Sequence, residues 1–335
     1  LLFALYINDL HDVLEGGLMV EIVNIRLLLY ADDIVILADD ITIMQNMIKN
    51  LENYCNMWNL TVNLNKSEML VFRNGGRLSQ HEKWFFNGEE VKISSVFNYL
   101  GVIFTPKLKF NKHIEKRNMQ AKNAINTTWQ NFIGKPEINL RMKWKVYLAV
   151  CRSIQSYAAQ VWGFGYFEEV DKLQRYFMKK ILNLPSFTPN YILMLETEAE
   201  DSYLYTFGLH LKYLSRTMYH YAEHRLPRQL SFILLRRNLF WVKELKSKAS
   251  SLNMHWPESN PTVLQWNQFS RELLNSLKQQ KFNERIQRKN ETTTRIYKHL
   301  DVESGKQYFI DNFNTNNLGI SLNYNRFVAE NMDRH

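Results

Sequence analysis

Cysteine is scarce in this sequence, and Cys55 and Cys151 are the only two among 335 residues. So few thiols exclude a disulfide scaffold and a cysteine-rich zinc module, and they suit a reducing compartment. The sequence also lacks an apolar run of about 18 uninterrupted residues, which a membrane-spanning helix needs. No charged-then-apolar leader opens it, and it contains no internal repeat. We therefore expect an intracellular protein of the nucleus and cytoplasm, with no secretion signal and no membrane partner.

Acidic residues are outnumbered, since 42 lysines and arginines against 33 aspartates and glutamates give a net charge of +9. A basic chain favours polyanionic partners such as nucleic acid, although the cations could equally be solvated helix faces. Hydrophobic residues make up 45% of the chain and aromatic residues 13%, so packed cores are expected and wholesale disorder is not. The length predicts about two domains, at a usual size of ~150 residues each.

Two adjacent acids, Asp32 and Asp33, interrupt an apolar stretch that runs from Ile25 to Ala38. Because β-prone runs flank a turn-prone pair, the stretch predicts a tight hairpin with the acids at its tip. Two carboxylates on a stiff support are the hard oxygen ligands that a divalent cation needs for phosphoryl transfer. The alternative is an ordinary turn, since aspartate side chains also bond to nearby backbone amides.

The flanks of this hairpin have patterns of their own. Leu18–Ile25 alternates as a strand that leads into the hairpin, and Asp39 and Asp40 are predicted to cap the helix that follows. An amphipathic helix is predicted at the start of the chain, because the spacing of Leu2, Leu5, Tyr6 and Asp9 places them on one face of a helix. The helix after the hairpin carries a core-facing stripe, in which Cys55 is a buried, inert thiol: Ile41, Met44, Met47, Ile48, Leu51, Tyr54, Cys55 and Trp58.

Further along, strand and helix signals alternate up to about residue 106. The second half of Leu60–Phe72 alternates as a strand, Asn87-Gly88 predicts a hairpin turn, and Val91–Phe104 predicts another strand pair. This pattern predicts an α+β layer. From Lys107 onward helical periods dominate, with helices expected over 141–161, 168–182 and 203–225. The Asn-rich end, Phe309–His335, is expected to pack loosely.

The helical part is basic and rich in aromatic residues. It begins with Lys107, Lys109, Lys112, Lys116, Arg117 and Lys122. Cations can follow the phosphates of a nucleic acid while aromatic rings stack on its bases. The alternative, which we favour for the tryptophans, is that the rings are core residues and only the cations are exposed. The aromatic residues concerned are Trp129, Trp144, Tyr147, Tyr157 and Trp162.

Four segments, in this order, resemble the later palm motifs of reverse transcriptases from non-LTR (LINE-type) retrotransposons of the jockey-like group. Leu1–Leu10 is similar to the end of motif B, Tyr30-Ala-Asp-Asp33 to motif C, Asn63–Ser67 to motif D, and Phe97–Gly101 to motif E, the primer grip. The resemblance implies a partial polymerase palm, an antiparallel sheet with helices, over residues 1–106. It also implies an all-helical thumb over 107–200 and a helical C-terminal extension over 201–335.

The resemblance further implies an RNA-directed DNA polymerase that adds deoxynucleoside triphosphates to a DNA primer on an RNA template, with Mg²⁺ or Mn²⁺ as cofactor. Asp32 and Asp33 would be catalytic metal ligands. Lys66 would protonate the departing pyrophosphate, unless it is only a solvated lysine at a strand edge. No homo-oligomer is expected. The residues at the primer or nucleic acid would be Tyr30, Ala31, Tyr99, Leu100, Gly101, Lys107, Lys109, Lys112, Lys116 and Arg117.

The sequence also departs from that family. We find no counterpart of motif A with its further metal-binding aspartate, of the fingers, or of the early half of motif B, so the isolated chain is expected to be inactive. The alternative function is a non-enzymatic nucleic-acid-binding remnant with a vestigial acidic hairpin. One short pattern, His220-Tyr-Ala-Glu-His224, fits a zinc peptidase signature. No third ligand is evident, and we expect no metal there.

Overall fold

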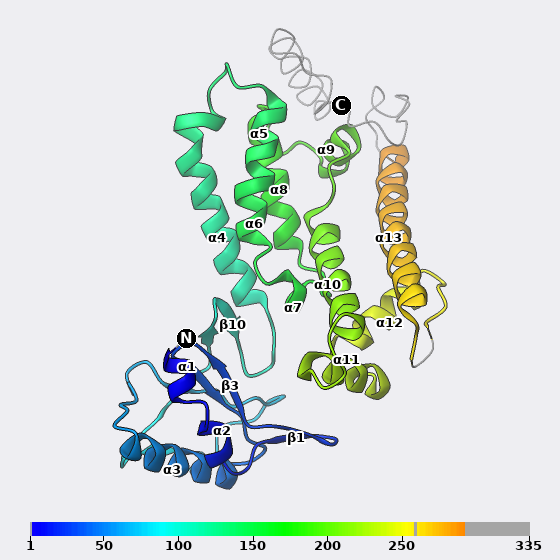
Figure 1. The fold of residues 1–335 in the computed structure, drawn as a ribbon. Helices are drawn as coiled ribbons and strands as arrows, with labels where there is room; N and C mark the ends of the chain where they lie inside the picture. The colour runs from blue at the N-terminus through cyan, green and yellow to red at the C-terminus, as the bar shows by residue number, and fades with distance from the viewer. Residues whose placement is uncertain (1, 258–259, 292–335) are drawn as a thin grey trace. The chain divides into compact units, whose positions relative to one another are not determined.

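The computed structural model describes residues 2–257 and 260–291, and the chain divides into two compact units, Leu1–Phe110 and Asn111–His335 (Figure 1). The first unit combines short strand pairs with helices, and the second is helical within the described residues. The chain is therefore an α+β protein, as predicted. In the part of the chain that the structure describes, no helix is both long and apolar enough to cross a membrane. The predicted loose end at Phe309–His335 lies outside the described residues.

The strands of the first unit form separate pairs rather than one continuous sheet. They are short, at two to four residues each, and among the described residues each pairs with a single neighbour. Four pairs are antiparallel, and β5 with β8 is parallel. The pairs are β1 (Leu18–Val20) with β2 (Val23–Ile25), β3 (Leu27–Tyr30) with β4 (Asp33–Ile36), β5 (Glu68–Met69) with β8 (Lys92–Ile93), β6 (Phe85–Phe86) with β7 (Glu89–Glu90), and β9 (Phe97–Tyr99) with β10 (Val102–Phe104).

Helix α3 (Ile41–Met57) begins at the cap that the sequence predicts. The Asp40 carboxylate accepts a hydrogen bond of 2.8 Å from the backbone amide of Ile43, which satisfies one of the amides left free at a helix start. Asp39 has a different role, because its carboxylate accepts a hydrogen bond of 3.0 Å from the amide of Met19. The prediction that both acids cap the helix is thus correct for one of them, and the other ties β1 to the start of α3.

Most of the predicted stripe of α3 forms the core of the first unit, but the prediction is wrong for Ile41, which is 37% exposed in the first turn of the helix. The stripe packs with Trp84 and Phe86 of the β6 region in one apolar cluster. Burial raises the pKa of the Cys55 thiol, so the thiolate is disfavoured and the prediction of an inert thiol is supported. The fully enclosed members of the stripe are Met47, Ile48, Leu51, Tyr54 and Cys55.

The N-terminal segment departs from the predicted single helix. A turn interrupts it, so that α1 (Leu2–Tyr6) ends before α2 (Leu10–Val13) begins. The predicted inner face is wrong for Leu2 and Leu5, which are 83% and 68% exposed. Because the interruption breaks the helical period, a different set of side chains turns inward: Ile7, Leu10 and Leu14.

Tight turns close the small hairpins. The predicted turn at Asn87-Gly88 is confirmed, since its φ angles of +48° and +82° are those of a type I′ turn. Leu100-Gly101 adopts the same pattern, at +47° and +78°, between β9 and β10. The segment Leu18–Ile25 corrects the prediction, because it folds back at Glu21 (φ +57°) into a hairpin of its own. It is not a strand that continues into the acidic hairpin.

The second unit is built from helices that run largely side by side (Figure 1). The predicted helix over 141–161 is divided into shorter pieces with π-helical turns, and the helix predicted over 203–225 ends at Tyr219. The elements are α4 (Asn111–Thr128), η1 (Trp129–Ile133), α5 (Leu140–Val146), η2 (Tyr147–Cys151), α6 (Arg152–Gln155), α7 (Ala159–Trp162), α8 (Glu168–Ile181), α9 (Asn190–Thr197), α10 (Ser202–Tyr219), α11 (Leu226–Arg237), α12 (Trp241–Ser251) and α13 (Val263–Glu291).

Aromatic side chains fill the core of the second unit. The Tyr147 ring stacks between Trp144 and Phe177, with ring centroids 5.0 and 4.6 Å away. Trp162 is fully buried and Trp144 nearly so. The interpretation of these two tryptophans as core residues is thus confirmed, whereas Trp129 is only partly buried and Tyr157 is 44% exposed.

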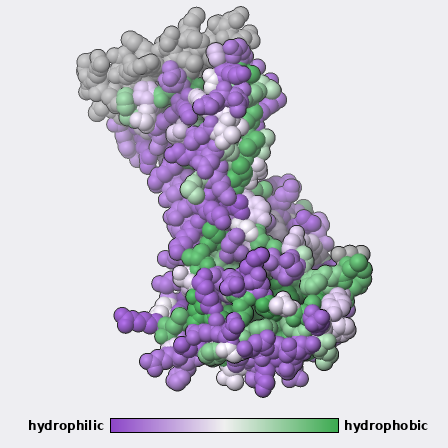
Figure 2. Space-filling view, turned by 90° about the vertical axis from the view of Figure 1, so that its left-hand side faces the viewer, coloured by the Kyte–Doolittle hydropathy of each residue, from purple (hydrophilic) through white to green (hydrophobic). Residues whose placement is uncertain are grey.

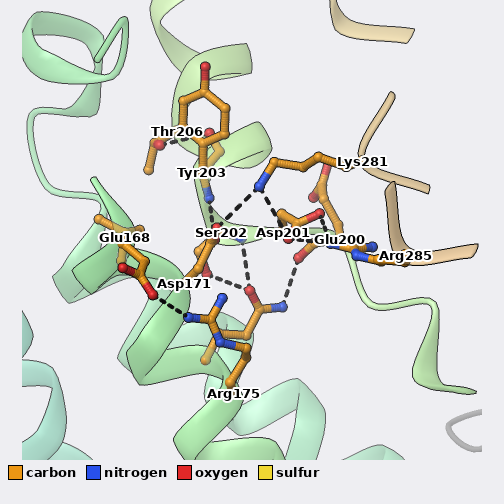
Figure 3. A network of polar contacts seen from close by, with 12 residues as sticks. Glu168, Asp171, Arg175, Glu200, Asp201, Ser202, Tyr203, Thr206, Lys281 and Arg285 are labelled. Carbon is orange, nitrogen blue, oxygen red and sulfur yellow. Dashed lines mark hydrogen bonds and ion pairs between the residues drawn. The ribbon is translucent and has the colours of Figure 1, made fainter. Parts of the chain in front are cut away.

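A buried ionic network joins α13 to the rest of the second unit (Figure 3). Arg285 donates to both carboxylate oxygens of Asp201, at 2.6 Å each. The Lys281 ammonium lies 3.4 Å from Asp171 and 3.7 Å from Asp201. Asp171 also accepts a hydrogen bond of 2.9 Å from the amide of Tyr203, at the start of α10. Residues from α8, α10 and α13 thus meet at one point.

The two acids of this network are the most enclosed charges in it. The Asp171 side chain is 2% exposed and that of Asp201 is 5% exposed. Burial raises the pKa of Asp171, and the neighbouring carboxylate of Asp201 raises it further, while Lys281 opposes both effects. Lys281, which contacts both carboxylates, and Arg285, which pairs with Asp201, together offset the cost of enclosing two acids at one site.

Candidate active site

The predicted acidic hairpin is confirmed, but its turn lies one residue earlier than the predicted Asp32-Asp33 pair, since Asp33 already belongs to β4. Tyr30 pairs with Asp33 at the last rung of β3 and β4, so only Ala31 and Asp32 form the turn. Ala31 has a φ of +53°, a left-handed conformation that costs energy in any residue with a Cβ atom. The tight turn therefore places both carboxylates at the end of the hairpin, and the cost is local backbone strain at Ala31.

The tip is exposed while its support is packed. Tyr30 is 62% exposed, and Ala31, Asp32 and Asp33 are exposed as well. Behind the tip, the hairpin packs against the α3 core through Leu27, Ile34 and Ile36. The carboxylates are thus free to meet a ligand, and the strands that carry them are anchored to the core of the first unit.

Tyr99 brings a second predicted segment to the same place. Its pKa is raised, first by burial and then by the negative charge of Asp33. The β9–β10 hairpin, with its turn at Leu100 and Gly101, therefore lies close to the acidic tip although 66 residues of sequence separate Asp33 from Tyr99. The structure thus brings together the segments that resemble motifs C and E.

Lys66 belongs to a separate segment, between α3 and β5. It lies in a turn, where its backbone amide donates a hydrogen bond of 3.0 Å to the carbonyl of Asn63, and its side chain is exposed. No contact between Lys66 and either acid is found among the described residues. The expected strand after it is reduced to the two residues of β5.

The predicted basic residues fall in both units. Lys107 and Lys109 are exposed in the loop that ends the first unit, where Lys109 bonds through its backbone to the Thr105 hydroxyl. The others, on α4, belong to the second unit, where Lys112 is exposed and Lys116 and Arg117 are half-buried. The Arg117 guanidinium lies 4.1 Å from the centre of the Tyr157 ring.

Two adjacent exposed carboxylates are hard oxygen donors that fit part of a Mg²⁺ ligand set. In the described part of the chain, no cluster of three or more acidic, histidine or cysteine side chains is arranged to hold a metal. The His220-to-His224 pattern does not form a helical pair, since α10 ends at Tyr219. Asp32 and Asp33 alone would supply only two of the oxygen donors that a Mg²⁺ site needs.

The sequence reasoning missed two features of the second unit. The first is the ionic network around Asp171 and Asp201, whose partners on α13 lie 84 and 110 residues further along. The second is a chain of cation–aromatic contacts that joins α4 to α8. The interleaving of lysines with aromatic residues in the sequence is a signal for these cation–aromatic contacts. It does not show which lysine lies over which ring, because helix packing decides that.

Comparison with known proteins identifies a protein family and a curated relative. Residues 1–104 match the family described as reverse transcriptase (RNA-dependent DNA polymerase). A curated relative, the RNA-directed DNA polymerase from mobile element jockey of Drosophila funebris, is 24% identical over 177 residues, which cover 51% of this chain and 19% of the relative. The chain thus spans about a fifth of the length of that relative. No solved structure matches.

Proposed function

Since this chain is a reverse transcriptase sequence of the non-LTR, jockey-like kind, we propose that it takes part in RNA-directed DNA synthesis with Asp32 and Asp33 at the reaction centre. The single observation that carries the proposal is the exposed acidic pair at the strained tip of a core-anchored hairpin. The first unit would be part of a polymerase palm, residues 107–200 the thumb, and residues 201–335 a helical extension.

The proposed reaction is a nucleotidyl transfer. The 3′-hydroxyl of a DNA primer attacks the α-phosphate of a deoxynucleoside triphosphate, and pyrophosphate leaves. Mg²⁺ or Mn²⁺ supplies charge neutralisation for the attacking and leaving oxygens when bound. Asp32 would ligate it directly, and Asp33 would assist as a partial ligand or by orienting its neighbour. In the family a further aspartate from motif A completes the ligand set, and we assign no residue of this chain to it.

The residues around the acids have positioning roles in this proposal. Tyr30 and Ala31 lie beside the acids and would face the primer terminus. Tyr99, Leu100 and Gly101 would hold the primer strand, which is supported by the influence of Asp33 on Tyr99. Lys66 would protonate the departing pyrophosphate, and its exposed side chain leaves its ammonium group accessible to a substrate.

The proposal is tested by primer extension on an RNA template with a restored enzyme, in which the fingers and early palm of a jockey-like reverse transcriptase are joined to this chain. Asp32→Asn removes a charged ligand without changing side-chain size, and we expect synthesis to fall at least about 100-fold. Asp12→Asn is the matched control, because Asp12 is an 84% exposed acid of the same unit, and synthesis should be unchanged. Equal synthesis by the Asp32 variant and the parent would overturn the proposal.

A second candidate function is nucleic-acid binding without synthesis. The observation that favours it is charge: between Lys116 and Phe167 the sequence holds eight lysines and arginines and a single acid, Glu137. Such a segment attracts the phosphates of a nucleic acid whether or not the acidic hairpin is catalytic. A restored enzyme that binds RNA in a salt-sensitive way but incorporates no nucleotide would favour this candidate over the polymerase.

A further inference from the structure

One end of the second unit combines lysines with accessible aromatic rings. The C-terminal ends of α4 and α8 lie next to each other there, with η1 continuing from α4 (Figure 1). The Lys180 ammonium is 4.0 Å from the centre of the Trp129 ring and 5.9 Å from that of Tyr176. The Lys122 ammonium is 5.4 Å from the centre of the same Tyr176 ring. We call these four residues, Lys122, Tyr176, Lys180 and Trp129, the cation–aromatic ladder.

The ladder lies at the surface, unlike the aromatic core behind it. Tyr176 is 37% exposed, Lys122 is exposed, and Trp129 and Lys180 are half-buried. By contrast, Trp162 and Tyr147 of the same unit are fully buried. Figure 2 shows that the face of this unit carrying α4 is mostly hydrophilic. The Tyr176 ring is therefore accessible to a ligand, whereas Trp129 is half-buried and packs with part of its surface against the apolar core of the second unit.

The ladder also lacks acidic partners. Within the described residues, neither Lys122 nor Lys180 forms an ion pair with a carboxylate. The acids of α8 are at its other end, where Glu168 pairs with Lys172 and Arg175. Lysines held over aromatic rings without counter-charge keep their positive potential available to an external anion.

This combination fits one class of ligand. Phosphates along a nucleic-acid backbone are attracted to the lysines, and bases can stack on the rings. Stacking requires unpaired bases, because the faces of bases within a double helix are covered by their neighbours. Two rings that share one lysine ammonium as a neighbour offer stacking surfaces beside positive charge, which favours a single strand over the grooves of a duplex.

We propose that the cation–aromatic ladder is a binding site for single-stranded nucleic acid. The proposal deepens the proposed function, since it names a surface of the second unit that would hold an unpaired strand, but its evidence is independent of the acidic hairpin. RNA and DNA share the phosphates and base faces on which it depends, so the experiment compares the two.

The test measures dissociation constants of the 335-residue chain by fluorescence anisotropy, with labelled RNA and DNA single strands of about 15 nucleotides and with a duplex of equal length. Tyr176→Leu, alone and combined with Trp129→Leu, should weaken binding of a single strand by about tenfold. Duplex binding should change less than about twofold. A larger effect on RNA than on DNA, or the reverse, identifies the strand that the site takes.

The lysines are tested through salt dependence. Lys122→Gln with Lys180→Gln should reduce the slope of log Kd against log salt by about 1.4, at about 0.7 per phosphate contact for single strands. Lys172→Gln is the control, because that lysine is on α8 and pairs with Glu168. Circular dichroism of each variant confirms folding, and Tyr176→Leu changes an exposed residue, so the test does not depend on the half-buried Trp129.

The proposal is refuted if the ring variants bind single strands as tightly as the unsubstituted chain, or if their affinity for the duplex falls by the same factor. This outcome is separate from failure of the polymerase proposal, because binding is measured without nucleotides or metal. If the ladder variants weaken single-strand binding while the restored enzyme makes no DNA, the ladder proposal is supported and the polymerase proposal is refuted.

Discussion

The carboxylate of Asp33 acts on the phenol of Tyr99: after burial, it is the next cause that raises the pKa of Tyr99 above its usual range. A negative charge disfavours the phenolate form, and this influence falls with distance. The two residues belong to hairpins that are well separated in sequence. Their coupling is therefore a direct sign that the acidic tip and the β9–β10 hairpin share one region of the first unit.

This coupling predicts the outcome of Asp33→Asn. Loss of the negative charge should lower the pKa of Tyr99, leaving only the increase caused by burial. NMR of the chain with ¹³C-labelled tyrosine can follow the titration, and Tyr99→Phe identifies the signal. Asp12→Asn should leave that signal in place, since Asp12 is not among the groups that act on Tyr99. An unchanged Tyr99 titration in Asp33→Asn would show that the two hairpins are not adjacent.

The strained turn predicts opposite effects for two substitutions at one position. Ala31→Gly should raise the free energy of unfolding by up to about 1 kcal/mol, because glycine adopts φ of +53° without steric cost. Ala31→Val should lower it by about 1 kcal/mol or more, since a β-branched residue tolerates this region worst. Urea denaturation followed by tryptophan fluorescence measures both. Destabilisation by glycine would mean that the turn is unstrained.

The ionic network predicts a large difference between two lysines one turn apart on α13. Lys281→Met leaves Asp171 and Asp201 enclosed without that partner, and we expect a loss of about 3 kcal/mol or more in unfolding free energy. Lys278→Met is the matched control: Lys278 lies 3.9 Å from Glu200 in a pair that is about half exposed, and its loss should cost at most about 1 kcal/mol. Equal losses would refute the role assigned to Lys281.

The same variant has a predicted pH dependence. The pKa of Asp171 is already raised, so the folded state binds a proton more tightly than the unfolded state does. Stability therefore falls as pH rises from the ordinary aspartate range through the raised pKa. Because Lys281 lowers the pKa of Asp171, Lys281→Met should widen this window toward higher pH, and denaturation at a series of pH values measures it. An identical pH profile in parent and variant would contradict the network.

A buried histidine predicts a second, opposite pH dependence. Burial lowers the pKa of His210 to about 4, and its Nδ1 bonds to the carbonyl of Gln160 at 2.7 Å. The unfolded state then binds the proton more tightly, so stability contributed by the neutral ring is lost as pH falls from about 6.5 toward 4. His210→Asn, which keeps a donor for the carbonyl, should flatten this part of the profile. His255→Asn, at an exposed histidine, is the control and should not.

Local patterns predicted those features in which neighbouring residues decide the conformation. The acidic hairpin follows from two apolar runs around a two-residue turn, and the Asn87-Gly88 turn from residues that accept positive φ. The α3 stripe follows from helical spacing with a capping aspartate at its start. At the N-terminus the same reasoning was wrong for Leu2 and Leu5, because a break in the helix changed which face turns inward.

The sequence by itself determined the α+β class, the acidic tip and the resemblance to reverse transcriptases, because each depends on residues close together in the chain. Only the tertiary structure decided that Asp33 acts on Tyr99, that Lys281 lies between two enclosed acids, and that Lys180 lies over the Trp129 ring. Long-range pairs of this kind have no periodicity in sequence. They arise when helices and hairpins pack, and burial then makes each charge depend on whichever neighbour the packing supplies.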